Sequence, residues 1–230
     1  MTFRFESSSH RYFVNGQERP HLTGLLKAAG LVNDAFYTEE SRIRGDAVHR
    51  LTSDYDLDAL DPSTLVSPYR GYLLGFVAAM RVIPHEWQRI EEPRMHPHYL
   101  YGYRTDRVGL IYRIQGVLEI KTTAAPCHAH EIQTALQVMG DSYEHPIPRE
   151  DWWRGALYLK PDGKWKLIEH THRRDFDDAD RILAQFCPPP CPLPAETLTE
   201  SRRRAVSDRR GSDRPGTAVA NRRAASRRSA

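Results

Sequence analysis

The sequence predicts an α/β fold, with a mixed central sheet of about five strands flanked by helices. Strand-like segments cluster between residues 87 and 122, and helical apolar spacing precedes and follows them. A second strand pair and a last helix come after residue 150. Elements in this order are typical of a sheet with helices packed on it. Hydrophobic residues make up 40% and charged residues 27% of the chain, as in globular proteins.

The N-terminal segment predicts a small hairpin followed by a short helix. Phe3–Phe5 and Tyr12–Val14 read as strands, and Asn15-Gly16 is a strong hairpin-turn signal. Leu22–Ala29 reads as a helix that ends at Gly30.

Two longer helices are predicted next. Thr38 is a suitable N-cap for a helix that runs to about Tyr55 and carries His49. Ser67-Pro68 predicts the start of the second helix, Pro68–Val82, whose apolar residues recur at helical spacing. We expect this second helix to lie in the core.

The centre of the predicted sheet follows. Trp87–Met95 reads as extended, so Glu91 and Glu92 point to opposite faces and no more than one can join a common site. Arg107–Tyr112 and Val117–Thr122 read as a hairpin that turns at Gln115-Gly116. A helix opened by Pro126 then presents an apolar stripe made of Ile132, Ala135, Leu136 and Met139.

A final hairpin and helix complete the predicted domain, which we place at residues 1–187. Ala156–Lys160 and Trp165–Glu169 flank a Pro-Asp-Gly turn, and Asp175–Phe186 reads as a helix. A proline cluster then ends regular structure. Residues 188–230 are rich in Pro and Arg, lack apolar periodicity and are predicted to be disordered.

Charge is unevenly distributed along the chain. Pro188–Ala230 holds ten arginines and four acids, a net charge of +6, so −3 remains on residues 1–187 from the overall +3. The basic tail either binds nucleic-acid phosphates non-specifically or is a solvated extension. The longest apolar stretch, Tyr72–Met80, is too short to span a bilayer, and the N-terminus lacks a signal peptide's apolar run. Three cysteines form no even disulfide set, so we expect a cytoplasmic protein.

The stretch between residues 101 and 137 combines residues suited to a metal site. Glu119 and Lys121 alternate with apolar neighbours in a strand, so both side chains share one face with Asp106 from the preceding strand. We expect Asp106, Glu119 and the Ile120 carbonyl to hold Mg²⁺ for phosphodiester hydrolysis. Lys121 would orient or deprotonate the attacking water.

Two further side chains could belong to that site. His49 could add a nitrogen ligand, which favours Mn²⁺. Gln133 could hydrogen-bond the water, Lys121 or a phosphate. The alternatives are a solvated Glu-x-Lys pair, a partly buried helix histidine and surface amides. We expect Gln137 to be a surface amide. Cys127, His128 and His130 suggest zinc, but their spacing does not match structural zinc patterns.

The chain resembles the PD-(D/E)xK nuclease superfamily, in particular its RecB-like, phage exonuclease-type branch. The resemblance spans roughly residues 3–186 and rests on four segments in order. They are RGDAVHRL (Arg44–Leu51), GYRTDRVG (Gly102–Gly109), LEIKT (Leu118–Thr122) and HEIQTALQ (His130–Gln137). The chain departs from the family's Q-x-x-x-Y motif at Gln137, where the motif has Tyr, and Thr105 replaces the usual Pro.

The resemblance implies a restriction-endonuclease-like core that cuts DNA with Mg²⁺ or Mn²⁺. It implies metal ligation by His49, Asp106 and Glu119, water activation by Lys121, and a site role for Gln133. Relatives with an iron–sulfur cluster use four cysteines, so we expect no cluster here. The implied setting is recombination or repair in a bacterial or phage-infected cell, with DNA and a recombination or replication protein as partners and no membrane.

Three functions remain open at this point. No DNA-reading module is evident, which favours an exonuclease that processes DNA ends over a sequence-specific endonuclease. The alternatives are a DNA-binding or assembly protein that kept the fold and lost cleavage, and a nuclease specific for RNA or for a nucleic-acid structure.

Overall fold

The computed structural model describes residues 2–32, 38–61, 63, 68–123, 125–143 and 145–187. The described residues all belong to the first of two units, Met1–Pro190. The tail predicted to be disordered lies outside the described residues, as does the predicted cap Ser67. Within the described ranges, no helix is both long and apolar enough to cross a membrane.

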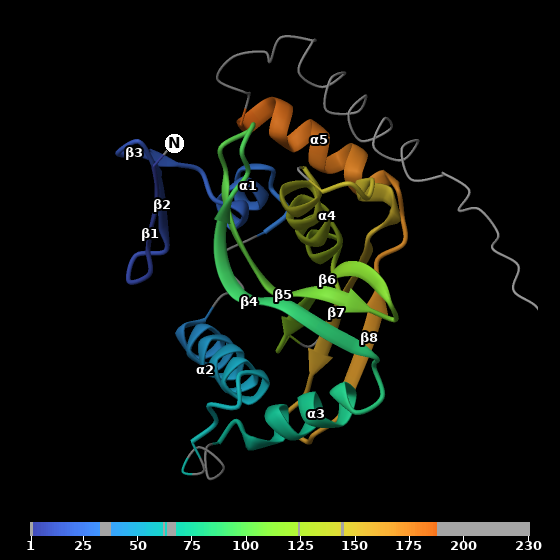
Figure 1. The fold of residues 1–230 in the computed structure, drawn as a ribbon. Helices are drawn as coiled ribbons and strands as arrows, with labels where there is room; N and C mark the ends of the chain where they lie inside the picture. The colour runs from blue at the N-terminus through green and yellow to red at the C-terminus, as the bar shows by residue number, and fades with distance from the viewer. Residues whose placement is uncertain are drawn as a thin grey trace, which may run out of the picture. The chain divides into compact units, whose positions relative to one another are not determined.

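A five-stranded mixed sheet forms the centre of the first unit, which confirms the predicted α/β class. Its order is β4-β5-β6-β7-β8, and only the β6–β7 pair is parallel. A helix, α4 (His128–Ser142), makes the crossover that parallel strands require (Figure 1). The strands are β4 (His85–Met95), β5 (Gly102–Ile111), β6 (Ile114–Lys121), β7 (Trp153–Leu159) and β8 (Trp165–Glu169).

Apolar side chains bury both faces of this sheet. Val117 of β6 belongs to a core cluster with α1, α4 and α5, whereas its neighbour Leu118 belongs to a second cluster with α2 and α3. Successive strand residues point to opposite faces, so one strand serves both cores. The helices are α1 (Leu22–Ala28), α2 (Glu39–Asp56), α3 (Arg70–Met80), α4 and α5 (Arg174–Phe186), with a 3₁₀ turn at Arg149–Asp151.

The N-terminal hairpin is confirmed and gains a third strand. The strands β1 (Phe3–Glu6), β2 (Arg11–Val14) and β3 (Gln17–Arg19) form a separate antiparallel sheet. Its β2–β3 turn is the predicted Asn15-Gly16 pair, with φ of 50° and 79°. An isolated parallel bridge between His21 and Gly102 joins this segment to the start of β5.

The central hairpin turns at a different place from the predicted one. The ladder pairs Ile111 with Ile114, so Tyr112 and Arg113 form the turn, both at positive φ (52° and 67°). Gly116 instead lies within β6, where a Cβ would come within 2.5 Å of the Trp153 carbonyl oxygen. The glycine therefore serves close strand packing, and the predicted turn at Gln115-Gly116 is wrong.

Helix starts are predicted unequally well. Thr38 caps α2 as predicted, because its side chain accepts a hydrogen bond of 3.1 Å from the Ser41 N–H. The next helix, α3, begins at Arg70 rather than Pro68 and has no side-chain cap. Burial of its apolar side chains, Phe76 among them, therefore holds α3 in place.

Candidate metal centre

Three acidic residues occupy neighbouring positions on three adjacent strands. In the β4–β5 ladder, Glu91 and Asp106 lie between the paired residues Ile90–Arg107 and Glu92–Thr105. The β5–β6 ladder ends with the Arg107–Leu118 pair, and Asp106 and Glu119 follow directly. The sheet order thus places Glu91, Asp106 and Glu119 at neighbouring register positions on β4, β5 and β6.

The regular pairing of the strands is interrupted at these residues. Glu91 has a positive φ of 52°, which is uncommon for a residue other than glycine. Asp106 Oδ2 accepts a hydrogen bond of 2.6 Å from the Ile120 backbone N–H. A carboxylate therefore takes the place of a backbone acceptor and fixes Asp106 against the middle of the Glu119-Ile120-Lys121 triplet.

His49 of α2 brings a nitrogen to the two carboxylates nearest to it. Its Nδ1 lies 3.0 Å from Glu91 Oε1 and 3.2 Å from Asp106 Oδ1. The three residues each offer a ligand atom, and these atoms lie within 4.8 Å of one another, so the group could hold a metal ion. The His49 side chain is 25% exposed and that of Asp106 5%, so the group opens to solvent on the His49 side.

The acids determine the charge of His49. Burial lowers its pKa, but the charges and hydrogen bonds of Asp106 and Glu91 outweigh burial and raise the pKa to about 10. At neutral pH the imidazole is protonated and acts as the cation between the two carboxylates. A metal ion that used this nitrogen would have to displace the proton.

Glu91 is the site residue that sequence reasoning did not assign. The strand pattern showed that either Glu91 or Glu92 could join the site, and the structure selects Glu91. Glu92 instead pairs with Arg94 at the surface. Arg104 of β5 also approaches the cluster, with its Nε 3.0 Å from Glu91 Oε2.

The other acidic residue, Glu119, lies in a clamp formed with α4. Its Oε1 accepts hydrogen bonds from Lys121 Nζ (3.0 Å) and Gln133 Nε2 (2.6 Å). Gln133 Oε1 in turn accepts from Lys121 Nζ at 2.8 Å. These three side chains come together as the spacing predicted.

Gln137 also belongs to the clamp, so its prediction as a surface amide is wrong. It is completely buried, and its Nε2 lies 2.8 Å from Glu119 Oε2. One helical turn separates it from Gln133, so both amides face the same carboxylate across the α4–β6 interface.

The structure divides the predicted site residues into two linked groups. His49 and Asp106 meet Glu91, whereas Glu119 meets Lys121 and the α4 amides; within the described residues, Glu119 is not a member of the three-ligand group. The Asp106–Ile120 hydrogen bond joins the two groups. Ile120 itself points its side chain into the core with α3 and pairs with Leu157 of β7.

The residues that suggested zinc do not form one cluster. His130 Nδ1 lies 2.7 Å from the Tyr158 hydroxyl in the interior, and burial together with the charge of Lys121 lowers its pKa to about 4. His128 lies at the surface instead, 2.8 Å from Glu131. It forms a second possible ligand group with Glu131 and Asp175.

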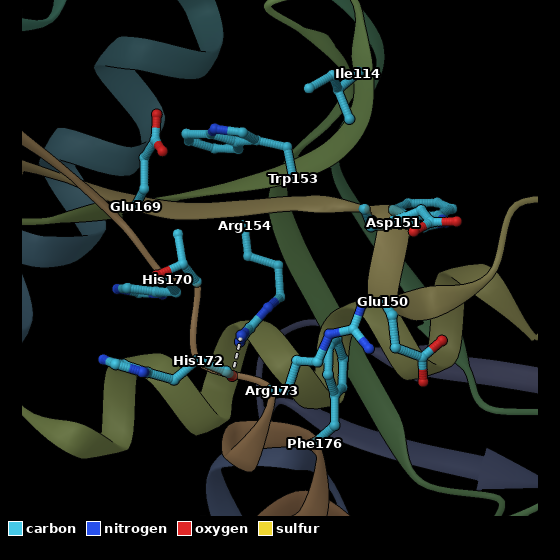
Figure 2. A pocket seen from close by; sticks show the side chains of 12 residues that line it. Ile114, Glu150, Asp151, Trp153, Arg154, Glu169, His170, His172, Arg173 and Phe176 are labelled. Atoms are coloured by element: carbon cyan, nitrogen blue, oxygen red, sulfur yellow. Dashed lines mark hydrogen bonds between the residues drawn. The ribbon is translucent and has the colours of Figure 1, made fainter.

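A hollow of about 250 Å³ lies elsewhere, beside β7, β8 and the start of α5 (Figure 2). Figure 2 shows Trp153 and Phe176 on its walls and Arg154 reaching across to the His172 carbonyl, a hydrogen bond of 3.0 Å. None of the residues that line it belongs to the candidate metal centre.

No known protein-family profile matches the sequence, and no curated protein matches it either.

Proposed function

We propose that this chain is a metal-dependent deoxyribonuclease with a restriction-endonuclease-like core, of the PD-(D/E)xK type. The observation that carries the proposal is the hydrogen bond between Asp106 Oδ2 and the Ile120 N–H. It joins a three-residue ligand group to a strand that carries a carboxylate and an ammonium two residues apart. A cation at this position could act as a Lewis acid on a phosphate oxygen, and the neighbouring ammonium could orient the attacking water.

The donor set fits a hard divalent cation with some preference for Mn²⁺. Glu91 and Asp106 supply oxygen atoms and His49 a nitrogen, and imidazole ligands favour Mn²⁺ over Mg²⁺. A bound cation would supply Lewis acidity to a phosphate oxygen and lower the pKa of a coordinated water. His49 would give up its proton when the cation binds.

Lys121 is the residue placed to orient the attacking water. Glu119 and Gln133 hold its ammonium from two sides, and its side chain is 15% exposed. In the proposed site this ammonium would orient a water or a phosphate oxygen. Gln137 fixes Glu119, so the α4 amides position the clamp without contacting the substrate.

DNA as the substrate and an exonuclease mode are drawn from the resemblance of the sequence segments described above. The same source suggests phage or prophage recombination in the cytoplasm, with a recombination or replication protein as partner. A site that opens to solvent on the His49 side, with no sequence-reading module among the described residues, is consistent with processing of DNA ends.

The direct experiment is a cleavage assay on end-labelled linear DNA, single- and double-stranded. We expect degradation by the wild-type protein with Mg²⁺ or Mn²⁺, no degradation with EDTA, and none by Lys121→Ala. Hairpin, flap and RNA substrates in parallel test structure-specific and RNA-directed cleavage. Intact DNA under every metal condition, with wild type and Lys121→Ala shifting it equally on a gel, would contradict a nuclease.

One observation favours the second candidate, a DNA-binding protein without cleavage. Glu91 is already paired with both His49 and Arg104, so protein cations compensate part of the charge that a metal would neutralise. Calorimetric titration with Mn²⁺ separates the two candidates. Binding that is lost in His49→Ala favours the nuclease, whereas no binding to the wild type favours the DNA-binding protein.

A further inference from the structure

The N-terminal sheet is attached to the strand that leads into the candidate metal centre. Tyr12 of β2 lies directly over Gly102, where an added Cβ would come within 2.0 Å of the tyrosine ring. The Gly102 N–H also donates a hydrogen bond of 2.8 Å to the Pro20 carbonyl oxygen. Only glycine fits at this position, so the tyrosine ring and β5 are in fixed contact.

Tyr12 has a hydroxyl group without a partner. The residue is 1% exposed, and among the described residues its hydroxyl forms no hydrogen bond. Burial raises the pKa of Tyr12 to about 12, while the Arg104 charge lowers it and the Glu91 charge raises it. The phenol therefore keeps its proton at neutral pH and is a neutral hydrogen-bond donor near these two charges. A buried donor without an acceptor costs free energy unless a ligand or water supplies one.

Arg104 is close enough for its charge to act on Tyr12, and it forms an ion pair with Glu91 of the candidate metal centre. It lies two residues after Gly102 in a stretch of β5 that keeps its register with β4, so its side chain leaves the strand on the face that Tyr12 covers. Its Nε lies 3.0 Å from Glu91 Oε2, and Glu91 contacts His49. The Arg104 side chain is 35% exposed, so a ligand can reach the guanidinium.

We propose that Tyr12 and Arg104 form a phosphate subsite, which binds a backbone phosphate of the nucleic-acid strand next to the phosphate that is cleaved. This proposal rests on the proposed nuclease function. A guanidinium and a neutral hydroxyl are both common donors to nucleic-acid phosphates. The Tyr12 hydroxyl is covered in this structure, so a phosphate paired with the exposed face of Arg104 would have to displace that cover before it could supply the acceptor that the hydroxyl lacks. The N-terminal sheet then serves as one wall of the substrate path.

The test compares Tyr12→Phe with wild type, because phenylalanine keeps the ring packed on Gly102 and removes only the hydroxyl. Tyr112→Phe, in the exposed β5–β6 turn, is the matched control. KM and kcat are measured on a labelled DNA oligonucleotide with Mn²⁺. Affinity for the same oligonucleotide is measured separately in the inactive Lys121→Ala background, with and without Tyr12→Phe.

We expect Tyr12→Phe to raise KM and the dissociation constant by about tenfold, with kcat within about twofold of wild type. Its melting temperature should be unchanged or higher, because the hydroxyl has no partner to lose. Arg104→Gln in the same background should also weaken binding. The double variant should lose less than the product of the two single losses, because both donors contact one phosphate.

Two results overturn the subsite while leaving the nuclease intact. One is wild-type KM and affinity in Tyr12→Phe; the other is a lower melting temperature of Tyr12→Phe without a change in KM, which would show a structural hydroxyl. Failure of the proposed function looks different. In that case the wild type cleaves no DNA under any metal condition, whether or not the Lys121→Ala protein still shifts DNA on a gel, and the subsite falls with the nuclease.

Discussion

Two clusters of charged side chains in this domain differ in how their charges are arranged and in how far they open to solvent. In the first, Arg154 donates from Nη2 to Asp175 Oδ2 at 2.8 Å and to the His172 carbonyl at 3.0 Å. Its Nη1 donates to the Glu131 carbonyl at 3.0 Å. The side chains of Arg154 and Asp175 are only 3% and 2% exposed. One cation meets one anion, and two backbone carbonyls and the Thr134 hydroxyl also accept hydrogen bonds from it.

The candidate metal centre is arranged in the opposite way. Two carboxylates converge on one imidazole that is 25% exposed, and a third carboxylate is held by amides and an ammonium nearby. In such a buried, balanced pair the charges already match each other, and removing one partner is costly to the fold. Converging acids with an open side can exchange the proton of His49 for a bound cation. We propose that this difference separates a structural cluster from a functional one.

The largest expected effect is the loss of cleavage in Asp106→Asn. We expect the rate to fall by about a thousandfold or more, because Asp106 is both a metal ligand and the link to Ile120. The melting temperature in EDTA should fall only modestly, since asparagine keeps an acceptor for the Ile120 N–H and Glu91 still pairs with protonated His49. A large drop in melting temperature together with the lost activity would make Asp106 a structural residue, like Asp175.

Arg154→Met should show the reverse pattern. Removing the cation leaves Asp175 buried without its ion-pair partner, which should lower the free energy of unfolding by about 3–5 kcal/mol. Cleavage by the fraction that remains folded should be close to wild type. Urea unfolding followed by circular dichroism measures the first quantity. A stability loss below about 1 kcal/mol would show that the sealed pair is not a structural element.

Gln137→Leu tests whether the clamp around Glu119 serves the site. The amide donates to Glu119 Oε2, and loss of such a supporting contact typically costs about 10- to 100-fold in metal affinity or activity. Gln17→Leu, at an exposed position of β3, is the control. Equal Mn²⁺ affinity and cleavage rate in the two variants would show that Gln137 only fills the α4–β6 interface.

The two clusters should also respond to pH in opposite directions. Burial and the Arg154 charge lower the pKa of His170, beside the sealed pair, to about 4. The unfolded state then binds more protons between about pH 6.5 and 4, and stability falls as the pH is lowered through that window. For His49, with its pKa raised to about 10, the folded state binds more protons. The contribution of His49 to the free energy of unfolding is present below about pH 6.5 and is lost as the pH rises towards 10.

Urea midpoints measured in EDTA across this pH range check both slopes. His170→Gln should reduce the loss of unfolding free energy at acid pH by about 1–2 kcal/mol relative to wild type. His49→Gln should reduce only the loss at alkaline pH. If both variants kept the wild-type dependence of stability on pH, on the acid and on the alkaline side, the assignment of opposite charge states would be contradicted.

Local patterns were sufficient to predict most of the fold. The Thr38 cap, the Asn15-Gly16 turn and the alternation around Glu119 are short-range signals, and each was confirmed in place. The turn at Tyr112-Arg113 was missed because it uses positive φ without glycine. Gly116 misled the prediction, because close packing against β7 requires a glycine as much as a turn does.

The site itself was only partly predictable, for a physical reason. Asp106, Glu119 and Lys121 lie close in sequence, so strand spacing alone placed them near one another. Glu91 joins through the register of β4 against β5, and Gln137 through the packing of α4 on β6. Both depend on contacts between distant segments, which one-dimensional periodicity does not contain.

The central claim is that a divalent cation bound beside Lys121 enables this chain to hydrolyse DNA. The most direct measurement is release of nucleotides from end-labelled DNA by the full-length protein in Mn²⁺, with Asp106→Asn prepared identically. We expect the wild-type protein to release nucleotides in Mn²⁺, EDTA to stop this release, and Asp106→Asn to release none. Release that continues in EDTA, or that the variant retains at the wild-type rate, would contradict it.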